Sequence, residues 1–229
     1  MKDLKKLEKN LDVVFKNKDL LKTATVHRSY LNEHKNFELD HNERLEFLGD
    51  AVLELVTTDY LYKNYPNPEG ELTNWRASLV NAKMLAAIAH DLAIEDFLYM
   101  SKGETQDANP KARNYILANA VEAIIGAIYL DQGLTKARDF INKNILGRLA
   151  HILEQQLYLD PKSKFQEKSQ EVFNVTPVYK VLEESGPDHN KFFKVGVYLN
   201  HEMVASGEGT SKQEAQVKAA QHAIEAKGW

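Results

Sequence analysis

The stretch His41-Asn-Glu-Arg-Leu-Glu-Phe-Leu-Gly-Asp-Ala-Val-Leu53 decides how the first part of this chain folds. Its apolar positions recur at helical spacing, which predicts a helix with one apolar face. That face is expected to consist of Leu45, Leu48, Val52 and Leu55. Glu46 and Asp50 are four residues apart on another face, and two carboxylates at this spacing repel each other unless a cation lies between them. The stretch is therefore either a local liability or half of a metal site.

A second pair of oxygen-bearing side chains lies in the strongly apolar segment Ile116–Asp131. Asn119 and Glu122 are three residues apart, so they share a helical face. Taken alone, an outward Glu122 and a locally bonded Asn119 are the simpler interpretation, because an unpaired buried charge is costly. Two helices that each carry an oxygen pair favour a shared site for a hard cation instead, and Gly49 and Gly126 would let these helices approach closely.

Composition limits the chemistry that is open to the chain. The 229 residues include no cysteine, which excludes disulfides, thiolate metal ligands and cysteine nucleophiles. Oxygen-rich ligands remain, so Mg²⁺ is the expected metal and Mn²⁺ a substitute. The sequence has no apolar run that could span a membrane, and its lysine-rich start lacks the apolar centre of a secretory signal. We therefore expect a cytoplasmic protein without a membrane partner.

Charge and periodicity both divide the chain. The net charge is −4, yet residues 161–229 hold nine lysines and nine acidic residues, so the acidic excess lies in residues 1–160. A helical period starts at Leu4, Leu7, Leu11 and Val14 and continues to about residue 157. Beyond it, alternating apolar positions predict strands, followed by an alanine-rich helix. The expected strands are 178–182, 192–199 and 202–208, and the expected helix is 211–227.

We therefore predict a mainly α domain, a helical bundle, over residues 1–157 and a linker over 158–162. A small α+β domain of the order α-β-β-β-α is expected over residues 163–229. A bundle of this kind can hold a metal site between facing helices.

The segment Asn42-Glu-Arg-Leu-Glu-Phe-Leu-Gly-Asp50 resembles the nine-residue signature of the bacterial ribonuclease III family. Companion motifs occur in the family order. They are His27-Arg-Ser-Tyr30, Glu69-Gly-Glu-Leu72, Arg76-Ala-Ser-Leu-Val-Asn81 and the 116–131 segment. Residues 161–229 are similar to the double-stranded-RNA-binding domain that follows the nuclease domain in this family, so the resemblance covers essentially the whole chain.

The resemblance implies a homodimeric, metal-dependent endoribonuclease for double-stranded RNA. It implies products with 5′-phosphate and 3′-hydroxyl ends and a short 3′ overhang, and it implies ribosomal-RNA precursors and structured messenger RNAs as substrates. Phosphodiester hydrolysis suits an acidic cluster, because two divalent ions held a few ångströms apart can activate water and stabilise the leaving oxygen.

The resemblance also assigns residues. Glu46, Asp50, Asn119 and Glu122 match the metal site. Of these, Glu122 and Asp50 are the catalytic residues: Glu122 is tied most directly to the chemistry, and Asp50 holds or activates the hydrolytic water. Phe47 resembles an aromatic plug that enters a pocket of the partner subunit, and an ordinary core phenylalanine is the alternative.

Accessory acidic positions and the RNA-binding surface follow from the same resemblance. Glu43 and Glu69 match acidic positions near the active-site valley, with structural or accessory roles. In the back domain, short polar side chains on one helical face would reach the 2′-hydroxyls of an RNA duplex, while Phe165, Val172 and Phe173 are available for the core. The polar face consists of Ser163, Gln166, Glu167 and Gln170.

A loop and a helix start complete the expected RNA contacts. His189 resembles a second minor-groove contact, although a turn histidine taken alone is more often merely solvated. Lys212 lies at a helix start, capped by Thr210 or Ser211, where free N–H groups favour a phosphate. Gln213 stands where related domains usually carry a second lysine, so we expect weaker phosphate attraction.

One departure from the family pattern bears on activity. The family usually has Asp where this chain has Asn119, and the amide keeps an oxygen donor while removing a negative charge. We expect weaker metal binding rather than an empty site; a natural variant and an engineered inactivating substitution both fit. The alternative functions are a double-stranded-RNA-binding protein with weak or no cleavage, and a helical metal protein whose acidic pairs serve stability alone.

Overall fold

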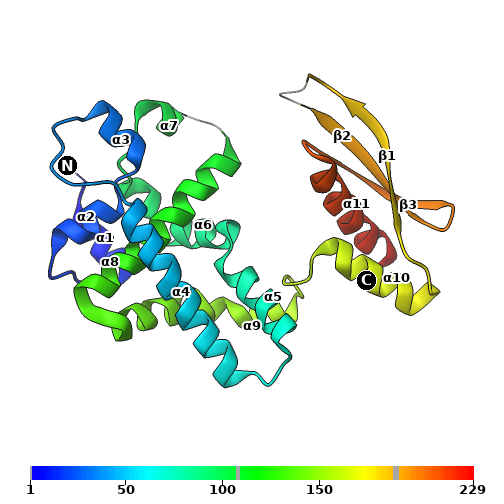
Figure 1. Cartoon of the computed structure of the whole chain (residues 1–229), viewed down its shortest axis with the longest axis horizontal. Coiled ribbons are helices and arrows are strands. Elements are labelled where there is room, and N and C mark those ends of the chain that lie inside the picture. The colour runs from blue at the N-terminus through cyan, green and yellow to red at the C-terminus, as the bar shows by residue number, and fades with distance from the viewer. Residues whose placement is uncertain (1, 107–108, 188–190) are drawn as a thin grey trace. The chain divides into compact units, whose positions relative to one another are not determined.

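The computed structural model describes residues 2–106, 109–187 and 191–229, and it divides the chain into two compact units (Figure 1). The first unit ends at Tyr158 and the second begins at Leu159. The first is helical and the second combines helices with a sheet, which confirms the predicted fold class. In the first unit the helices are α1 (Leu4–Leu11), α2 (Lys18–Ala24), α3 (Arg28–Glu33), α4 (Glu43–Asn64), α5 (Glu69–Val80), α6 (Ala82–Asp91), the 3₁₀ helix η1 (Ile94–Phe97), α7 (Lys102–Gln106), α8 (Pro110–Asn144), the 3₁₀ helix η2 (Leu146–Arg148) and α9 (Leu149–Glu154).

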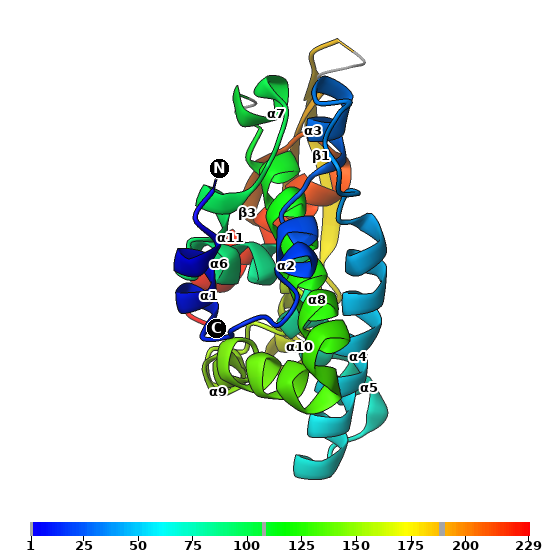
Figure 2. The ribbon, with the colours of Figure 1, turned by 90° about the vertical axis from the view of Figure 1, so that its left-hand side faces the viewer.

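Helices α4 and α8 pack side by side at the centre of the first unit (Figures 1 and 2). From Leu117 to Ile128, α8 buries nearly every side chain because α2, α4 and α6 surround it. A helix that is apolar on all sides is the expected sequence for such a position. The two polar exceptions are Asn119 and Glu122, which are half-buried. Further along, α8 bends at Gly133, whose φ of 81° is a conformation that favours glycine.

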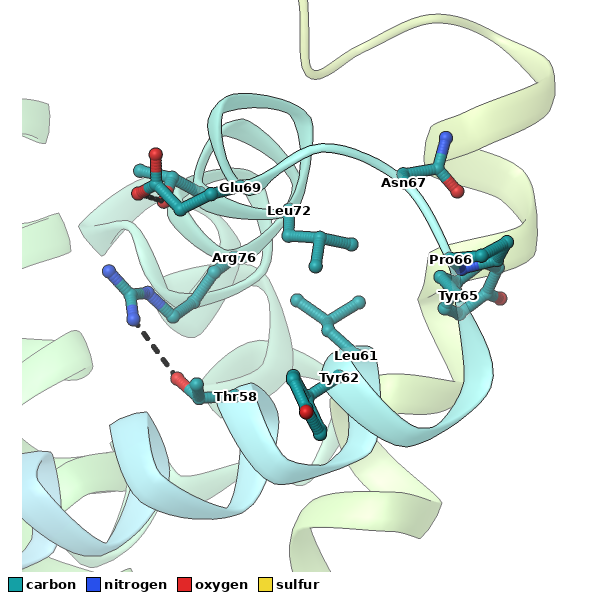
Figure 3. A pocket seen from close by; sticks show the side chains of 10 residues that line it. Thr58, Leu61, Tyr62, Tyr65, Pro66, Asn67, Glu69, Leu72 and Arg76 are labelled. Carbon is teal, nitrogen blue, oxygen red and sulfur yellow. Dashed lines mark hydrogen bonds between the residues drawn. The ribbon is translucent and has the colours of Figure 1, made fainter.

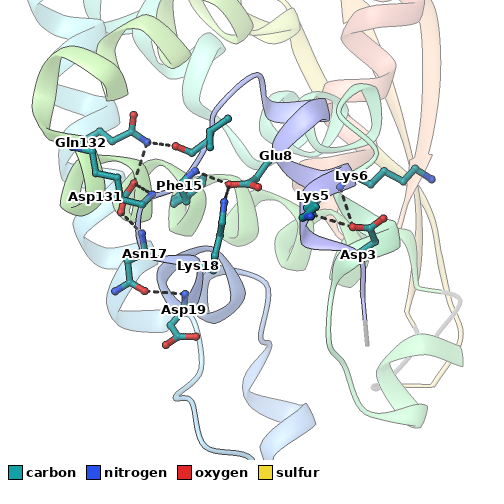
Figure 4. Close-up of polar contacts among 12 residues, drawn as sticks. Asp3, Lys5, Lys6, Glu8, Phe15, Asn17, Lys18, Asp19, Asp131 and Gln132 are labelled. Carbon is teal, nitrogen blue, oxygen red and sulfur yellow. Dashed lines mark hydrogen bonds and ion pairs between the residues drawn. The ribbon is translucent and has the colours of Figure 1, made fainter.

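The connection between α1 and α2 is held by two carboxylates (Figure 4). The Asp131 side chain, on α8, accepts the backbone N–H groups of Lys16 and Asn17, both at 2.8 Å. Glu8, on α1, accepts the N–H of Phe15 at 2.6 Å and also pairs with a lysine of α2. Because each carboxylate satisfies donors that would otherwise lack partners, Asp131 fixes the connection to α8 and Glu8 fixes it to α1.

The second unit consists of a three-stranded antiparallel sheet with α10 and α11 on one face. Its elements are α10 (Pro161–Phe173), β1 (Val178–Ser185), β2 (Phe192–Leu199), β3 (Glu202–Gly209) and α11 (Lys212–Lys227). Asp160 caps α10, so residues 161 and 162 of the expected linker belong to this helix. A Cβ at Gly207 would lie 2.2 Å from the backbone nitrogen of Ala219, so close packing of β3 on α11 needs small residues on both.

Three apolar side chains that we expected in the cores lie at the surface. Leu55 is 58% exposed because the buried stripe of α4 turns away from it. The helical period that we expected to include Val14 is interrupted earlier, because α1 ends at Leu11 and Val14 lies in the connection that follows it. Val172 and Phe173 are about half exposed at the end of α10, where the Phe173 ring lies against that of Trp229. Within the described residues, no helix combines the length and apolar character that crossing a membrane requires.

Candidate active site

The crossing of α4 and α8 depends on two glycines. A Cβ at Gly49 would lie 1.7 Å from the carbonyl oxygen of Glu122, and one at Gly126 would lie 2.2 Å from the carbonyl oxygen of Leu45. Neither helix could carry a side chain at these points without moving apart, so the close approach expected from the sequence is present. The crossing brings the acidic face of α4, on either side of Gly49, against the polar positions of α8.

Glu122 is the group most affected by this convergence. Burial, followed by the nearby charges of Asp50, Glu46 and Glu54 in that order, raises the pKa of its carboxyl to about 8. A carboxyl becomes a weak acid when it loses water and faces like charges. A bound cation would relieve both costs, so the pKa shift indicates a site whose charge is uncompensated without a cation.

Glu46 has the same problem to a smaller degree. Burial is the largest cause that raises its pKa, and the charge of Glu43 is the next. A hydrogen bond with the Asn119 side chain works in the opposite direction, while Asp50 adds a smaller upward contribution. The Asn119 amide therefore stabilises the ionised form of Glu46, which an aspartate at that position would oppose.

The donor set suits a hard divalent cation. It offers the carboxylate oxygens of Glu46, Asp50 and Glu122 and the amide oxygen of Asn119, with no sulfur or imidazole among the four. In the described ranges, no three His, Asp or Glu side chains form a ready-made metal cage. Mg²⁺ does not require one, because it binds through one or two carboxylates and keeps water or phosphate oxygens for the rest of its octahedron.

Two further carboxylates of α4 flank this set, and both pair with arginines. The carboxylate of Glu43 lies 3.4 Å from the guanidinium of Arg28, and that of Glu54 lies 2.9 Å from Arg76 Nε. Sequence reasoning missed Glu54, although its position four residues after Asp50 was a usable signal. Its pairing with Arg76 joins two helices and has no signal in the sequence.

Glu69 lies apart from the acidic set. It is the first residue of α5, its side chain accepts the Thr73 hydroxyl at 2.9 Å, and it lines a pocket between α4 and α5. Within the part of the chain that the structure describes, no hydrogen bond or ion pair joins Glu69 to the four predicted metal-site residues. Glu69 would act beside the predicted metal site only in an assembly with another chain.

Phe47 projects from α4 into solvent. Its side chain is 81% exposed, so the alternative of an ordinary core phenylalanine is wrong. A phenylalanine that is exposed to this extent loses the stabilisation that burial would provide.

The polar residues predicted to bind RNA lie on the second unit. Ser163, Gln166, Glu167 and Gln170 are all exposed on α10. At the start of α11, Ser211 accepts the N–H of Glu214 and so acts as the cap. Lys212 lies 3.4 Å from a carboxylate oxygen of Glu184 and remains more than half exposed. His189 lies outside the described residues.

Comparison with known proteins gives the same two parts. Residues 17–149 match a family model described as ribonuclease-III-like, and residues 161–227 match the double-stranded RNA binding motif. The chain is 42% identical over 225 residues to Ribonuclease 3 of Nitratiruptor sp., covering 98% of this chain and 96% of that protein. It is 42% identical over 224 residues to Ribonuclease 3 of Oceanobacillus iheyensis, covering 97% of each.

Solved structures agree for the first unit. A crystal structure of the nuclease domain of ribonuclease III from Campylobacter jejuni is 42% identical and has a TM-score of 0.55, covering 65% of this chain and 97% of that one. A second structure of that domain, with the same identity and TM-score over 63% of this chain and 97% of that one, concerns a flexible region involved in its dimer formation.

Fold, acidic site and RNA-binding unit together define the class of protein: an endoribonuclease for double-stranded RNA. Within this class, the chain belongs to the ribonuclease III family, in which dependence on divalent metal ions is general.

Proposed function

We propose that the chain acts as a homodimer that uses Mg²⁺, or Mn²⁺ in its place, to cut both strands of double-stranded RNA. Each cut leaves a 5′-phosphate and a 3′-hydroxyl, with a short 3′ overhang between the two cuts. Ribosomal-RNA precursors and structured messenger RNAs are the proposed substrates, and the cytoplasm is the proposed location. The observation that carries the proposal is the convergence of carboxylates from α4 and α8 at the Gly49–Gly126 crossing.

Glu46, Asp50 and Glu122, with the amide oxygen of Asn119, would hold the metal. A bound divalent ion supplies hydroxide from water near neutral pH and neutralises the phosphate. The side chain of Asp50 makes no hydrogen bond or ion pair within the described residues and is exposed, so its carboxylate is available to orient the hydrolytic water. Glu122 is the more buried carboxylate and lies beside the crossing, which fixes its position.

Asn119 makes this site weaker without emptying it. Its amide hydrogen-bonds to Glu46. Rotation of the amide would present its oxygen to a cation instead, but at the cost of that hydrogen bond and without a negative charge. We therefore propose active but metal-demanding catalysis.

RNA binding is the proposed role of the second unit. The exposed polar side chains of α10 would contact 2′-hydroxyls in the wide minor groove of an A-form duplex. Lys212, at the N-terminus of α11, would exchange Glu184 for a phosphate, which the free N–H groups of the helix start also favour. His189 is the proposed second minor-groove contact. Domains of this type recognise duplex shape over about 16 base pairs, largely without regard to sequence.

The proposed dimer surface is an exposed apolar stripe on α4. Phe47, Leu55 and Tyr62 are 81%, 58% and 80% exposed. Their spacing of eight and seven residues places them on one side of the helix. Exposed apolar stripes of this kind mark interaction surfaces. A second copy is the proposed occupant because the related Campylobacter jejuni nuclease domain forms dimers.

Two-fold symmetry gives this stripe a self-complementary arrangement. If two α4 helices run antiparallel about an axis near Leu55, Phe47 of one protomer faces Tyr62 of the partner subunit, and the reverse contact forms by symmetry. Tyr62 lines a pocket of about 460 Å³, in which Leu61 and Leu72 form apolar walls (Figure 3). The pocket is therefore the proposed receptacle for Phe47.

The proposed cleavage is tested with a labelled RNA duplex in Mg²⁺ or Mn²⁺, comparing the wild-type chain with Glu122→Gln and Asn119→Asp. We expect metal-dependent cutting by the wild type, loss of cutting in Glu122→Gln, and cutting at lower Mg²⁺ in Asn119→Asp. Mapping both product ends tests the 5′-phosphate, the 3′-hydroxyl and the overhang. Equal rates for the wild type and Glu122→Gln would contradict the site.

One alternative has a specific observation in its favour. Asn119 stabilises the ionised form of Glu46 through a hydrogen bond and brings no negative charge of its own to a cation, which favours a duplex-binding protein that cuts weakly or not at all. The same experiment separates the two functions. A wild-type chain that retards the duplex on a gel but leaves it intact, together with an Asn119→Asp variant that cuts it, supports the binder.

A further inference from the structure

Helix α4 carries a longer acidic row than the metal site needs. Its members are Glu43, Glu46, Asp50 and Glu54, separated by three, four and four residues. This spacing places all four carboxylates on one face of the helix. The row would attract a divalent cation anywhere along its length unless its inner and outer carboxylates differ in how far their charge is compensated.

Ion pairing makes that distinction. Within the described residues, only the outer members of the row have cationic partners: Glu43 pairs with Arg28 at 3.4 Å and Glu54 pairs with Arg76 at 2.9 Å. The two inner members, Glu46 and Asp50, have none there. The full negative charge of the row is therefore left at its centre, beside the crossing with α8.

Arg76 is the better fixed of the two arginines. Besides pairing with Glu54, it donates a hydrogen bond from Nη1 to the Thr58 hydroxyl at 3.0 Å, as Figure 3 shows. Its two acceptors lie one turn apart on α4, so a single conformation satisfies both. The Arg76 side chain is 34% exposed, whereas that of Arg28 is 69% exposed and forms one ion pair. Exposed single pairs of this kind contribute little.

Glu54 lies one turn beyond Asp50, and its charge acts on Glu122 across the helix crossing even while Glu54 is paired with Arg76. Without that partner, the charge of Glu54 would act on the proposed metal site at full strength. Removing Arg76 alone would therefore make the site more negative and extend it toward α5. Removing Glu54 alone would leave an uncompensated cation next to the site.

We propose that Arg76 is a positioning residue that, by pairing with Glu54, confines the cation-attracting charge of α4 to Glu46 and Asp50. This inference rests on the proposed metal site and adds to it a residue from another helix. Glu54 is then not a metal ligand, despite its place in the acidic row.

The test measures Mn²⁺ affinity of the full chain, with free Mn²⁺ followed by electron paramagnetic resonance. Arg76→Gln should bind Mn²⁺ about three- to tenfold more tightly than the wild type, and Glu54→Gln should bind it more weakly by a similar factor, from the energy of one charge several ångströms from a divalent ion in a largely aqueous medium. The double variant should return to within about twofold of the wild type, because its two charge changes cancel.

Lys63→Gln is the matched control, because it also removes a cation that pairs with a carboxylate of α4, Asp59 at 2.7 Å, but further from the site. It should leave the Mn²⁺ affinity unchanged. A purely structural role for Arg76 would not be reversed by removing the Glu54 charge. A double variant as weak as Glu54→Gln would make Glu54 a ligand and overturn the proposal, as would an unchanged affinity in Arg76→Gln.

If circular dichroism shows that Arg76→Gln does not fold, Arg76→Lys and Glu54→Asp keep both charges and decide the matter. Each should bind Mn²⁺ within about twofold of the wild type, since the pair remains neutral. Marked weakening by Glu54→Asp would overturn the proposal. Failure of the metal site itself gives another result: the wild type would then bind no Mn²⁺ and Glu122→Gln would change nothing.

Discussion

The backbone carbonyl of Glu122 faces Gly49 so closely that a Cβ at Gly49 would lie 1.7 Å from its oxygen. Gly49 is the residue before Asp50 and the third after Glu46. The contact that packs α4 on α8 therefore also sets the positions of the carboxylates relative to one another. Stability and the proposed metal binding therefore depend on the same few atoms.

Gly49→Ala should destabilise the first unit by about 3 kcal/mol or more, because the added methyl meets backbone that cannot rotate away. Urea unfolding followed by the fluorescence of Trp75, which is buried in this unit, measures the change. Gly70→Ala is the control: a Cβ there meets nothing within 4 Å, and alanine favours the helix, so it should stabilise by ~0.5–1 kcal/mol. Equal effects at both glycines would contradict the crossing.

Glu122→Gln should raise the melting temperature of the first unit in EDTA at pH 7. The substitution removes a carboxyl whose pKa burial and neighbouring charges raise to about 8, which corresponds to ~1–3 kcal/mol of recovered stability. The same variant should lose the stabilisation that Mg²⁺ gives the wild type. Glu154→Gln, at an exposed position of α9, should show neither effect. A lower melting point for Glu122→Gln in EDTA would count against the buried site.

Phe47→Ala should shift the protein toward monomer, with a dissociation constant at least about 30-fold higher, because a central aromatic anchor of an interface contributes 2 kcal/mol or more. Sedimentation or light scattering over a concentration series measures it. Tyr62→Ala should act in the same direction if the pocket beside Tyr62 receives Phe47. Val14→Ala removes an equally exposed apolar side chain away from α4 and should leave the mass unchanged.

Glu214 should make the second unit sensitive to acid. Hydrogen bonds from the hydroxyl and the N–H of Thr210, followed by the interaction with Lys218, lower its pKa to about 2. A carboxyl with a lowered folded-state pKa stabilises the fold above its ordinary value of 4.5, and this contribution is lost as pH falls toward 2. Glu214→Gln should therefore be less stable than the wild type at pH 7, by less than ~1 kcal/mol because the group is partly exposed. The difference should vanish near pH 2, measured by the fluorescence of Trp229.

The sequence predicts the architecture well because local patterns determine it. The apolar run of α8, the alternation of β2 and the alanines of α11 each match the way in which that element packs against its neighbours. The helix crossing was also predictable, since Gly49 and Gly126 each place a residue without a side chain in a helix that carries an oxygen pair. These features need only spacing and residue size.

Other features could not be predicted, because helical periodicity does not say how wide the buried stripe is or where its cover ends. Leu55 has the spacing of a core residue and lies outside the stripe, and Phe173 remains half exposed at the end of α10. The pairing of Arg76 with Glu54 joins residues 22 positions apart in the sequence, and only the packing of α5 on α4 brings them together.

The hydrogen bonds of Asp131 to Lys16 and Asn17 span about half of the polypeptide. During synthesis, the N-terminal connection must therefore leave the ribosome with its N–H groups hydrated and wait until more than a hundred further residues have emerged. The sheet of the second unit joins strands that follow one another directly, so it can form as soon as it is made. The first unit can therefore complete its fold only after a long stretch of chain has been made, whereas the sheet of the second unit forms from consecutive segments.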